Sequence, residues 1–238
     1  VVFPEYSVPW EILGGVADAA GDMVVVAGTH TVDRAARRSR IYEQLVAPAA
    51  PHLGASVCPV LHRGRLLALV PKLHPGPPER ESMAPGDAWA PVQMPDGLPG
   101  PMGALIGLDF LHRDSPRGRA LVAPHLDRCR FLAIPSLTPA TTGPEFAGKA
   151  WEEARRHGRP ALYADGAEGG GSSIFVDEGR IHDLRRFPEH AGYLEPGDEG
   201  VIVADVDLGF ERPGASARYD APRPVIPFAE ATLVYRGH

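Results

Sequence analysis

The chain has 238 residues, and its 44% hydrophobic and 23% charged content is typical of a folded globular protein rather than a disordered one. A formal net charge of −6 argues against a dedicated nucleic-acid or anionic-membrane binder, because such proteins carry a basic stripe. Two cysteines are too few for a disulfide framework or a cysteine zinc site, and no apolar run reaches the roughly 20 residues of a membrane span. With no recognisable signal peptide, we expect a cytoplasmic protein.

Short apolar runs predict the strands of the first half of the chain. Residues 1–3 have the composition of the end of a buried strand, so we expect the chain to belong to a longer polypeptide. Residues 34–47 suit a helix but also a long loop, and residues 75–101 are so rich in proline and glycine that no regular element is expected there. The predicted strands are residues 24–27, 57–61 and 66–70, the last two forming a hairpin that turns at Gly64.

The second half alternates predicted strands and helices. The clearest helix covers residues 146–157, where Phe146, Ala150 and Ala154 share one face and Gly158 ends it. This order predicts one α/β domain over residues 1–238 with mixed sheets. The other predicted elements are strands at residues 103–108, 131–135, 161–164, 174–176, 201–206 and 232–235, a helix at 115–127 interrupted by Pro124, a glycine loop at 169–173 and a turn at 177–180.

Three charged residues stand at the ends of predicted strands, where α/β scaffolds commonly carry catalytic groups. Glu5 follows an apolar strand end and a proline, so partial desolvation can raise its pKa into the range of a general base; an ordinary solvated glutamate is the alternative. Lys72 is one of only two lysines in an arginine-rich chain, which indicates a need for a compact ammonium group, although a surface lysine remains the alternative. Asp109 follows the strand at 103–108.

Taken together, these segments resemble the nitrilase superfamily of carbon–nitrogen hydrolases. The resemblance implies a four-layer α-β-β-α sandwich, without the strand and helix that usually open it. It places Glu5 as the general base, Lys72 as the group that stabilises the oxyanion, and Glu79 as the residue that orients the lysine. The matching segments, as far as about residue 212, are Phe3-Pro4-Glu5, residues 27–30, the hairpin at 60–72, Gly103 to Asp109, residues 133–136, Gly170-Gly171-Ser172-Ser173-Ile174 and residues 177–179.

The same resemblance places the family's nucleophilic cysteine at Gly107, and glycine supplies no nucleophile. Neither Cys58 nor Cys129 stands in its place, because one lies in the hairpin and the other precedes the strand at residues 131–135. Removing a catalytic nucleophile costs on the order of 10⁴–10⁶ in rate, so ordinary cysteine-dependent hydrolysis is not expected. The resemblance assigns substrate contacts to Asp109, Ser136 and Ser172.

The expected function is therefore a carbon–nitrogen hydrolase-like domain that binds a ligand or mediates assembly. The alternative is an active hydrolase of amide, ureido or nitrile bonds, in which Glu5 and Lys72 activate a water molecule. A small molecule of those classes is the expected ligand, and fused domains are compatible with the sequence. The histidines lack metal-binding spacing, so no metal or cofactor is expected.

The resemblance also implies a homodimer or larger assembly through the helices predicted at residues 115–127 and 146–157. Phe146 and Trp151 lie about 140° apart around the second helix, so one core face does not bury both. The remaining aromatic is a candidate interface anchor. Packing of Trp151 under the loop at residues 139–144 is the alternative.

Overall fold

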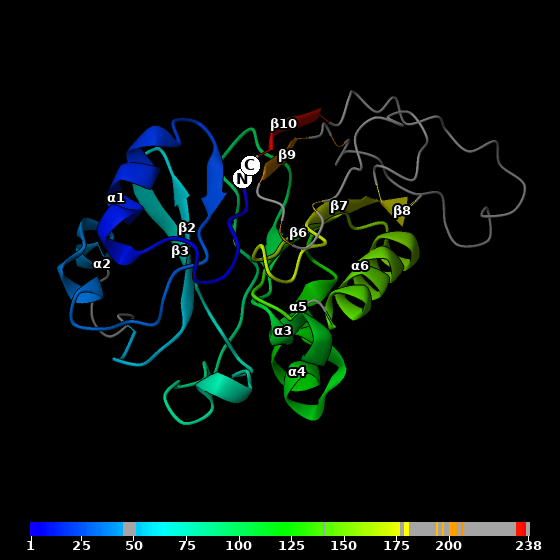
Figure 1. Cartoon of the computed structure of the whole chain (residues 1–238), viewed down its shortest axis with the longest axis horizontal. Coiled ribbons are helices and arrows are strands. Elements are labelled where there is room, and N and C mark those ends of the chain that lie inside the picture. The colour runs from blue at the N-terminus through cyan, green and yellow to red at the C-terminus, as the bar shows by residue number, and fades with distance from the viewer. Residues whose placement is uncertain are drawn as a thin grey trace, which may run out of the picture.

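Two facing sheets form the centre of the fold, and helices cover their outer sides (Figure 1). The computed structural model describes residues 1–44, 51–139, 141–176, 179–180, 194, 197, 200–203, 206 and 232–236. Among these residues, β1 (Val24–Val26), β2 (Val57–His62) and β3 (Arg65–Pro71) form an antiparallel sheet in that order. The second sheet has the order β4 (Met102–Ala104), β5 (Phe131–Pro135), β6 (Ala161–Ala164), β7 (Ser173–Val176) and β8 (Gly179–Arg180), and β9 (Gly200–Val203) pairs with β10 (Thr232–Arg236).

Successive side chains of β2 point to opposite faces of the first sheet, and each face packs against a different layer. Val57 and Leu61 pack in a cluster with the helix α1 (Trp10–Ala19) and with α2 (Arg40–Glu43). Cys58 and Val60 point to the opposite side and belong to the core shared with the second sheet. Because successive strand residues face opposite sides, one face of this sheet meets helices and the other meets the second sheet.

The second sheet is parallel where helices connect its strands. β4, β5 and β6 run parallel, whereas β7 and β8 are antiparallel neighbours. Helix α6 (Gly143–His157) starts with a proline in its first turn and ends at Gly158, and its residues Phe146, Ala150 and Ala154 are buried. Together with α3 (Leu108–Leu111), it covers the outer side of the sheet. The predicted four-layer α-β-β-α sandwich is confirmed.

Two predictions of local structure were wrong in extent. The strand predicted at residues 103–108 stops at Ala104, because the chain turns at Gly107 into α3. The helix predicted at 115–127 is two short helices, α4 (Pro116–Leu121) and α5 (Ala123–Leu126). Pro124 lies in the first turn of α5, where its missing N–H costs no hydrogen bond, so it opens a helix rather than only breaking one.

The remaining segments differ in smaller ways. Residues 1–3 form a single parallel bridge, Val2 to Val26, at the edge of β1 rather than a full strand. The loop at 75–101 contains the short 3₁₀ helix η2 (Pro77–Glu79), and two more such turns are η1 (Ala36–Arg38) and η3 (His112–Asp114). Residues 45–47, 177–178 and 204–205 of the predicted elements lie outside the described residues. No helix in the described ranges has the length and apolar content to cross a bilayer.

Candidate functional site

Close backbone packing places Glu5 at the junction of the two sheets. The Glu5 N–H donates to the carbonyl of Ser136, the residue that follows β5, at 3.1 Å. Residues 4–5 pass directly over Gly28, where a Cβ atom would lie 1.9 Å from the Pro4 carbonyl oxygen and 2.6 Å from the Glu5 Cα. Only glycine permits this approach, so Gly28, which follows the strand predicted at residues 24–27, also positions Glu5.

Lys72 is held at the exit of β3 by its own backbone. Its N–H donates to the Ser56 carbonyl at 2.9 Å, and its carbonyl accepts from the Gly86 N–H at 2.8 Å. The next residue, Leu73, donates its N–H to both carboxylate oxygens of Asp109 at 3.0 Å. These hydrogen bonds fix the backbone at the end of β3, and so they fix the position from which the Lys72 side chain extends.

The ammonium group of Lys72 lies between two carboxylates. Its Nζ is 2.5 Å from Glu5 Oε1 and 2.7 Å from Glu79 Oε2. The Lys72 and Glu5 side chains are only 4% and 3% exposed, so water screens this contact weakly. The side chains of Glu5, Lys72 and Glu79 therefore converge, whereas their roles in chemistry stay predictions.

Burial and charge pairing shift the pKa values of Glu5, Lys72 and Glu79. Desolvation raises the pKa of Glu5 to about 7, against the opposing effect of Lys72. Burial alone would lower the pKa of Lys72, but the two carboxylates outweigh it and raise that pKa. For Glu79 burial favours the neutral acid, yet hydrogen bonds from Lys72 and Tyr6 outweigh it and lower its pKa. Near neutral pH the lysine is charged, and Glu5 can exchange a proton as a general base does.

Gly107 faces this charged group from the turn between β4 and α3. Its φ of +49° and ψ of −118° form a sharp strand-to-helix turn in a backbone region that side chains rarely adopt. A Cβ atom on Gly107 would lie 2.8 Å from Glu5 Oε2 and 3.9 Å from Lys72 Nζ. The position that the resemblance assigns to a nucleophile thus points at the predicted base and the predicted oxyanion-stabilising group. Strained strand-to-helix turns of this kind can present nucleophiles.

The three residues predicted to contact substrate have different surroundings in the structure. Asp109 is buried, and its carboxylate accepts from the N–H groups of Leu73 and His74 and from the His74 ring, so its position favours a role in fixing the strand exit. Ser136 is buried beside the site and accepts the Glu5 N–H through its carbonyl. Ser172 bonds to the backbone of Asp165 and, within the described residues, has no hydrogen bond to Glu5, Lys72 or Glu79. Direct ligand contact by any of them stays a prediction.

Tyr6 is a site residue that the sequence analysis did not identify. Its hydroxyl donates to Glu79 Oε1, and its ring lies under the Lys72 ammonium, 5.8 Å from Nζ to the ring centroid. Its φ of +61° is unusual for a bulky residue, which indicates that its surroundings hold the backbone in a strained conformation. The position directly after Glu5 was the available signal, but the left-handed backbone that turns the ring toward Lys72 has no marker in the sequence.

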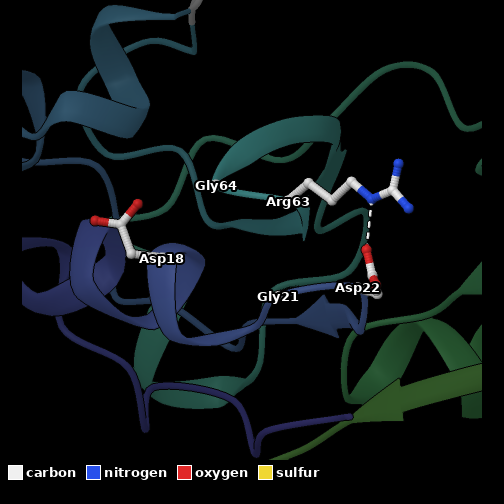
Figure 2. A pocket seen from close by; sticks show the side chains of 5 residues that line it. All are labelled: Asp18, Gly21, Asp22, Arg63 and Gly64. Atoms are coloured by element: carbon white, nitrogen blue, oxygen red, sulfur yellow. Dashed lines mark hydrogen bonds and ion pairs between the residues drawn. The ribbon is translucent and has the colours of Figure 1, made fainter.

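Two surface hollows lie at the other end of β2 and β3, away from Lys72. Figure 2 shows one of about 310 Å³, where the turn at Arg63 and Gly64 faces the turn before β1. Arg63 Nε is 2.6 Å from Asp22 Oδ1, but both side chains are mostly exposed. The neighbouring hollow, of about 800 Å³, is bordered by the hairpin and by residues 95–98. Neither contains a predicted site residue, and the described residues form no cluster of three metal-ligating side chains.

Comparisons with known proteins point to one fold. No protein-family description and no curated sequence matches the chain. Among solved structures, a carbon–nitrogen hydrolase from Helicobacter pylori G27 is 15% identical over 72% of this chain and 61% of its own, with a TM-score of 0.51.

Two further structures are similar at lower scores. A mutant amidase from Nesterenkonia sp. AN1 has 17% identity, coverage of 72% and 60%, and a TM-score of 0.48. The C. elegans NitFhit protein has 19% identity, coverage of 71% and 41%, and a TM-score of 0.46. The chain thus spans about three fifths of the length of the first two relatives. With its two layered sheets and its likeness to the Helicobacter pylori structure, the chain has the fold of a carbon–nitrogen hydrolase.

Proposed function

We propose that this domain binds a small molecule with an amide, ureido or nitrile group and lacks cysteine-dependent hydrolysis. The observation that carries the proposal is the position of Gly107, whose missing side chain points at Glu5 Oε2 and Lys72 Nζ. A thiol at this position would lie within reach of a base and a cation, and with glycine there the Glu5 carboxylate approaches the backbone directly. The site then retains its binding groups without a side chain that can form a covalent intermediate.

The charged groups in the space beside Gly107 suit a neutral polar ligand. An ammonium group can donate three hydrogen bonds, and Lys72 Nζ contacts three oxygen atoms, Glu5 Oε1 and both carboxylate oxygens of Glu79, so a ligand carbonyl oxygen or nitrile nitrogen has to replace one of the two Glu79 contacts. Glu5 Oε2 faces the same space and can accept from a ligand N–H. Amides and ureas carry both groups on one small unit, which favours them over simple carboxylates.

The test restores a thiol with Gly107→Cys and offers wild type and variant the same amides, ureas and nitriles. We expect wild type to bind members of the panel without turnover, and the variant to form a covalent adduct or turn them over. Mass spectrometry can assign an adduct to residue 107, since burial raises the pKa of the Cys58 thiol and raises that of Cys129 to about 11, and both react slowly.

Gly21→Cys is the matched control. Gly21 has a φ of +54°, close to that of Gly107, but open space lies around its Cβ position. This variant carries a similar positive φ and an accessible thiol, and it should gain no turnover. Absence of both binding by wild type and reactivity of Gly107→Cys would overturn the proposal.

A second candidate function is hydrolysis by an activated water molecule in the space beside Gly107. The pKa of Glu5, raised to about 7, favours this candidate, because a general base works best when its pKa lies near the working pH. It requires turnover by wild type that rises with pH near 7 and is lost in Glu5→Gln. Turnover with that profile would replace the binding proposal.

We further propose that the domain self-associates through α6 and works in the cytoplasm. Phe146 is fully buried, whereas Trp151 is 46% exposed on the same helix, with the Arg155 guanidinium 5.5 Å from its ring. An exposed tryptophan is a typical interface anchor. Light scattering should give a mass above 25 kDa that falls in Trp151→Ala; a monomeric wild type would contradict the assembly. The two free, buried cysteines suit a reducing compartment.

A further inference from the structure

A serine, a histidine and an aspartate, Ser115, His74 and Asp109, form a chain of hydrogen bonds outside the cluster of Glu5, Lys72 and Glu79. The Ser115 Oγ lies 3.3 Å from Nε2 of His74, and the His74 Nδ1 lies 3.0 Å from Oδ1 of Asp109. Asp109 is fully buried, the His74 side chain is 16% exposed, and Ser115 is partly exposed. The order from buried acid to accessible hydroxyl is the one that activates a serine nucleophile.

The surroundings of Asp109 select the tautomer that this activation needs. Its carboxylate accepts from the N–H groups of Leu73 and His74, the latter at 2.6 Å, so it is held as an acceptor beside the imidazole. Nδ1 of His74 therefore carries the proton that it donates to Asp109, and Nε2 presents a lone pair to Ser115. The ring of His112 stacks on that of His74, with centroids 5.4 Å apart, which restricts rotation of the imidazole.

Ser115 also caps the short helix α4, and the two contacts are compatible. Its Oγ accepts from the N–H of Gly118 at 3.1 Å, which uses a lone pair of the hydroxyl oxygen. The hydroxyl hydrogen remains available for His74 Nε2. A cap needs only an acceptor, so capping alone gives no reason for a histidine and a buried acid behind the serine.

We propose that Ser115, His74 and Asp109 form a second reactive centre, which takes activated esters and related acyl or phosphonyl reagents. With an aryl ester, Ser115 Oγ forms a bond to the carbonyl carbon and its proton moves to His74 Nε2. The bond from the carbonyl carbon to the aryl oxygen then breaks, and the aryl oxide leaves and takes up that proton. Water then attacks the acyl-serine, giving a carboxylic acid and the free hydroxyl. With a fluorophosphonate, the Ser115–phosphorus bond forms, fluoride leaves, and the adduct is stable.

The experiment treats the whole chain with a fluorophosphonate probe and with 4-nitrophenyl acetate. Digestion and mass spectrometry of wild type should find the probe on Ser115. Because positioned general bases contribute about 10²–10⁴-fold, His74→Gln should slow labelling at least about 100-fold. Ser115→Asn should abolish labelling at residue 115, while its side-chain oxygen keeps the helix cap, and thermal melting checks that the variant is folded.

Ser39 supplies the matched control. It caps α2 through a 3.1 Å contact with the Tyr42 N–H and is partly exposed like Ser115, but it makes no hydrogen bond to a histidine in the part of the chain that the structure describes. Ser39→Asn should label like wild type. No adduct on wild type, an adduct on another serine, or equal labelling rates for wild type and His74→Gln would each overturn the proposal, and the wild-type adduct map decides even if a variant does not fold.

Discussion

Two buried ionic clusters of opposite composition lie in this fold. The site cluster places one cation, Lys72, between the carboxylates of Glu5 and Glu79. The arginine cluster places one carboxylate between two cations: the Glu153 oxygens lie 2.8 Å from Arg113 Nη1 and 2.5 Å from Arg159 Nη2. Both are shielded from solvent, so burial and charge pairing alone do not distinguish a candidate site from a structural tie.

The difference lies in what surrounds each cluster. The arginine cluster ties α6 to the segment that contains η3, and the Arg113 guanidinium packs 4.8 Å from the Phe110 ring centroid, so its planar groups are enclosed by side chains. The site cluster instead faces the missing side chain of Gly107. It also contains a group whose pKa lies near 7, which a purely structural pair does not need. The glycine at position 107 and the titrating Glu5 distinguish the site cluster from the arginine cluster, which has a structural role.

The largest expected effect concerns the arginine cluster. Glu153→Ala leaves two buried guanidinium groups without their carboxylate, which should lower the free energy of unfolding by about 3–5 kcal/mol. The control is Glu152→Ala on the same helix, whose pair with Arg156 is exposed and should contribute less than about 1 kcal/mol. Urea denaturation measures both. Equal stabilities of the two variants would contradict the structural role of the cluster.

Next in size is Lys72→Met, which removes the cation from the site cluster. Glu5 and Glu79 then face each other without compensation, so the loss of stability should approach about 3 kcal/mol at pH 8. At pH 5 the loss should be smaller, because without its cation Glu5 takes up a proton more readily. Unfolding curves at the two pH values give this difference. A loss independent of pH would mean that the lysine does not control the ionisation of Glu5.

Glu5→Gln isolates the pKa shift itself. In the folded protein the pKa of Glu5 is raised to about 7 from an ordinary value of 4.5, so this group stabilises the fold in acid relative to neutral pH. Its contribution is complete below about pH 4.5 and is lost as pH rises through 7, a change on the order of 3 kcal/mol. The glutamine variant lacks that loss, so its stability relative to wild type should increase from pH 5 to 8. Parallel stability curves would contradict the shift.

Gly107→Ala should have the smallest effect. Its positive φ costs an alanine roughly 1–2 kcal/mol, and the methyl group must displace the flexible carboxylate of Glu5. Gly21→Ala has a similar φ in open space, so the difference between the two variants measures the contact with the site cluster. We expect a difference below about 1 kcal/mol by thermal denaturation. A more stable Gly107→Ala would mean that this position is not directed at the charged group.

Local pattern was sufficient for most of the strands but not for every helix. The β-branched and apolar runs predicted β5, β6 and the hairpin of β2 and β3 to within about a residue at most ends, because strand formation is tied to short runs of such residues. Helix α1 was not predicted: it contains Gly14 and Gly15, both poor helix formers. Burial of Trp10, Leu13 and Ala17 against the first sheet supplies the stability that local propensity lacks.

The sequence by itself identified Glu5 and Lys72 as residues at the ends of strands, and the family resemblance added Glu79 and the glycine at position 107. Those features depend on short-range pattern and on family resemblance. Only the tertiary structure decided which of them meet, because Glu5 and Lys72 are 67 positions apart and are joined only by the packing of two sheets. It also decided the contacts of Tyr6 and Ser115, since a left-handed backbone and a hydrogen bond between distant loops leave no periodic trace in the chain.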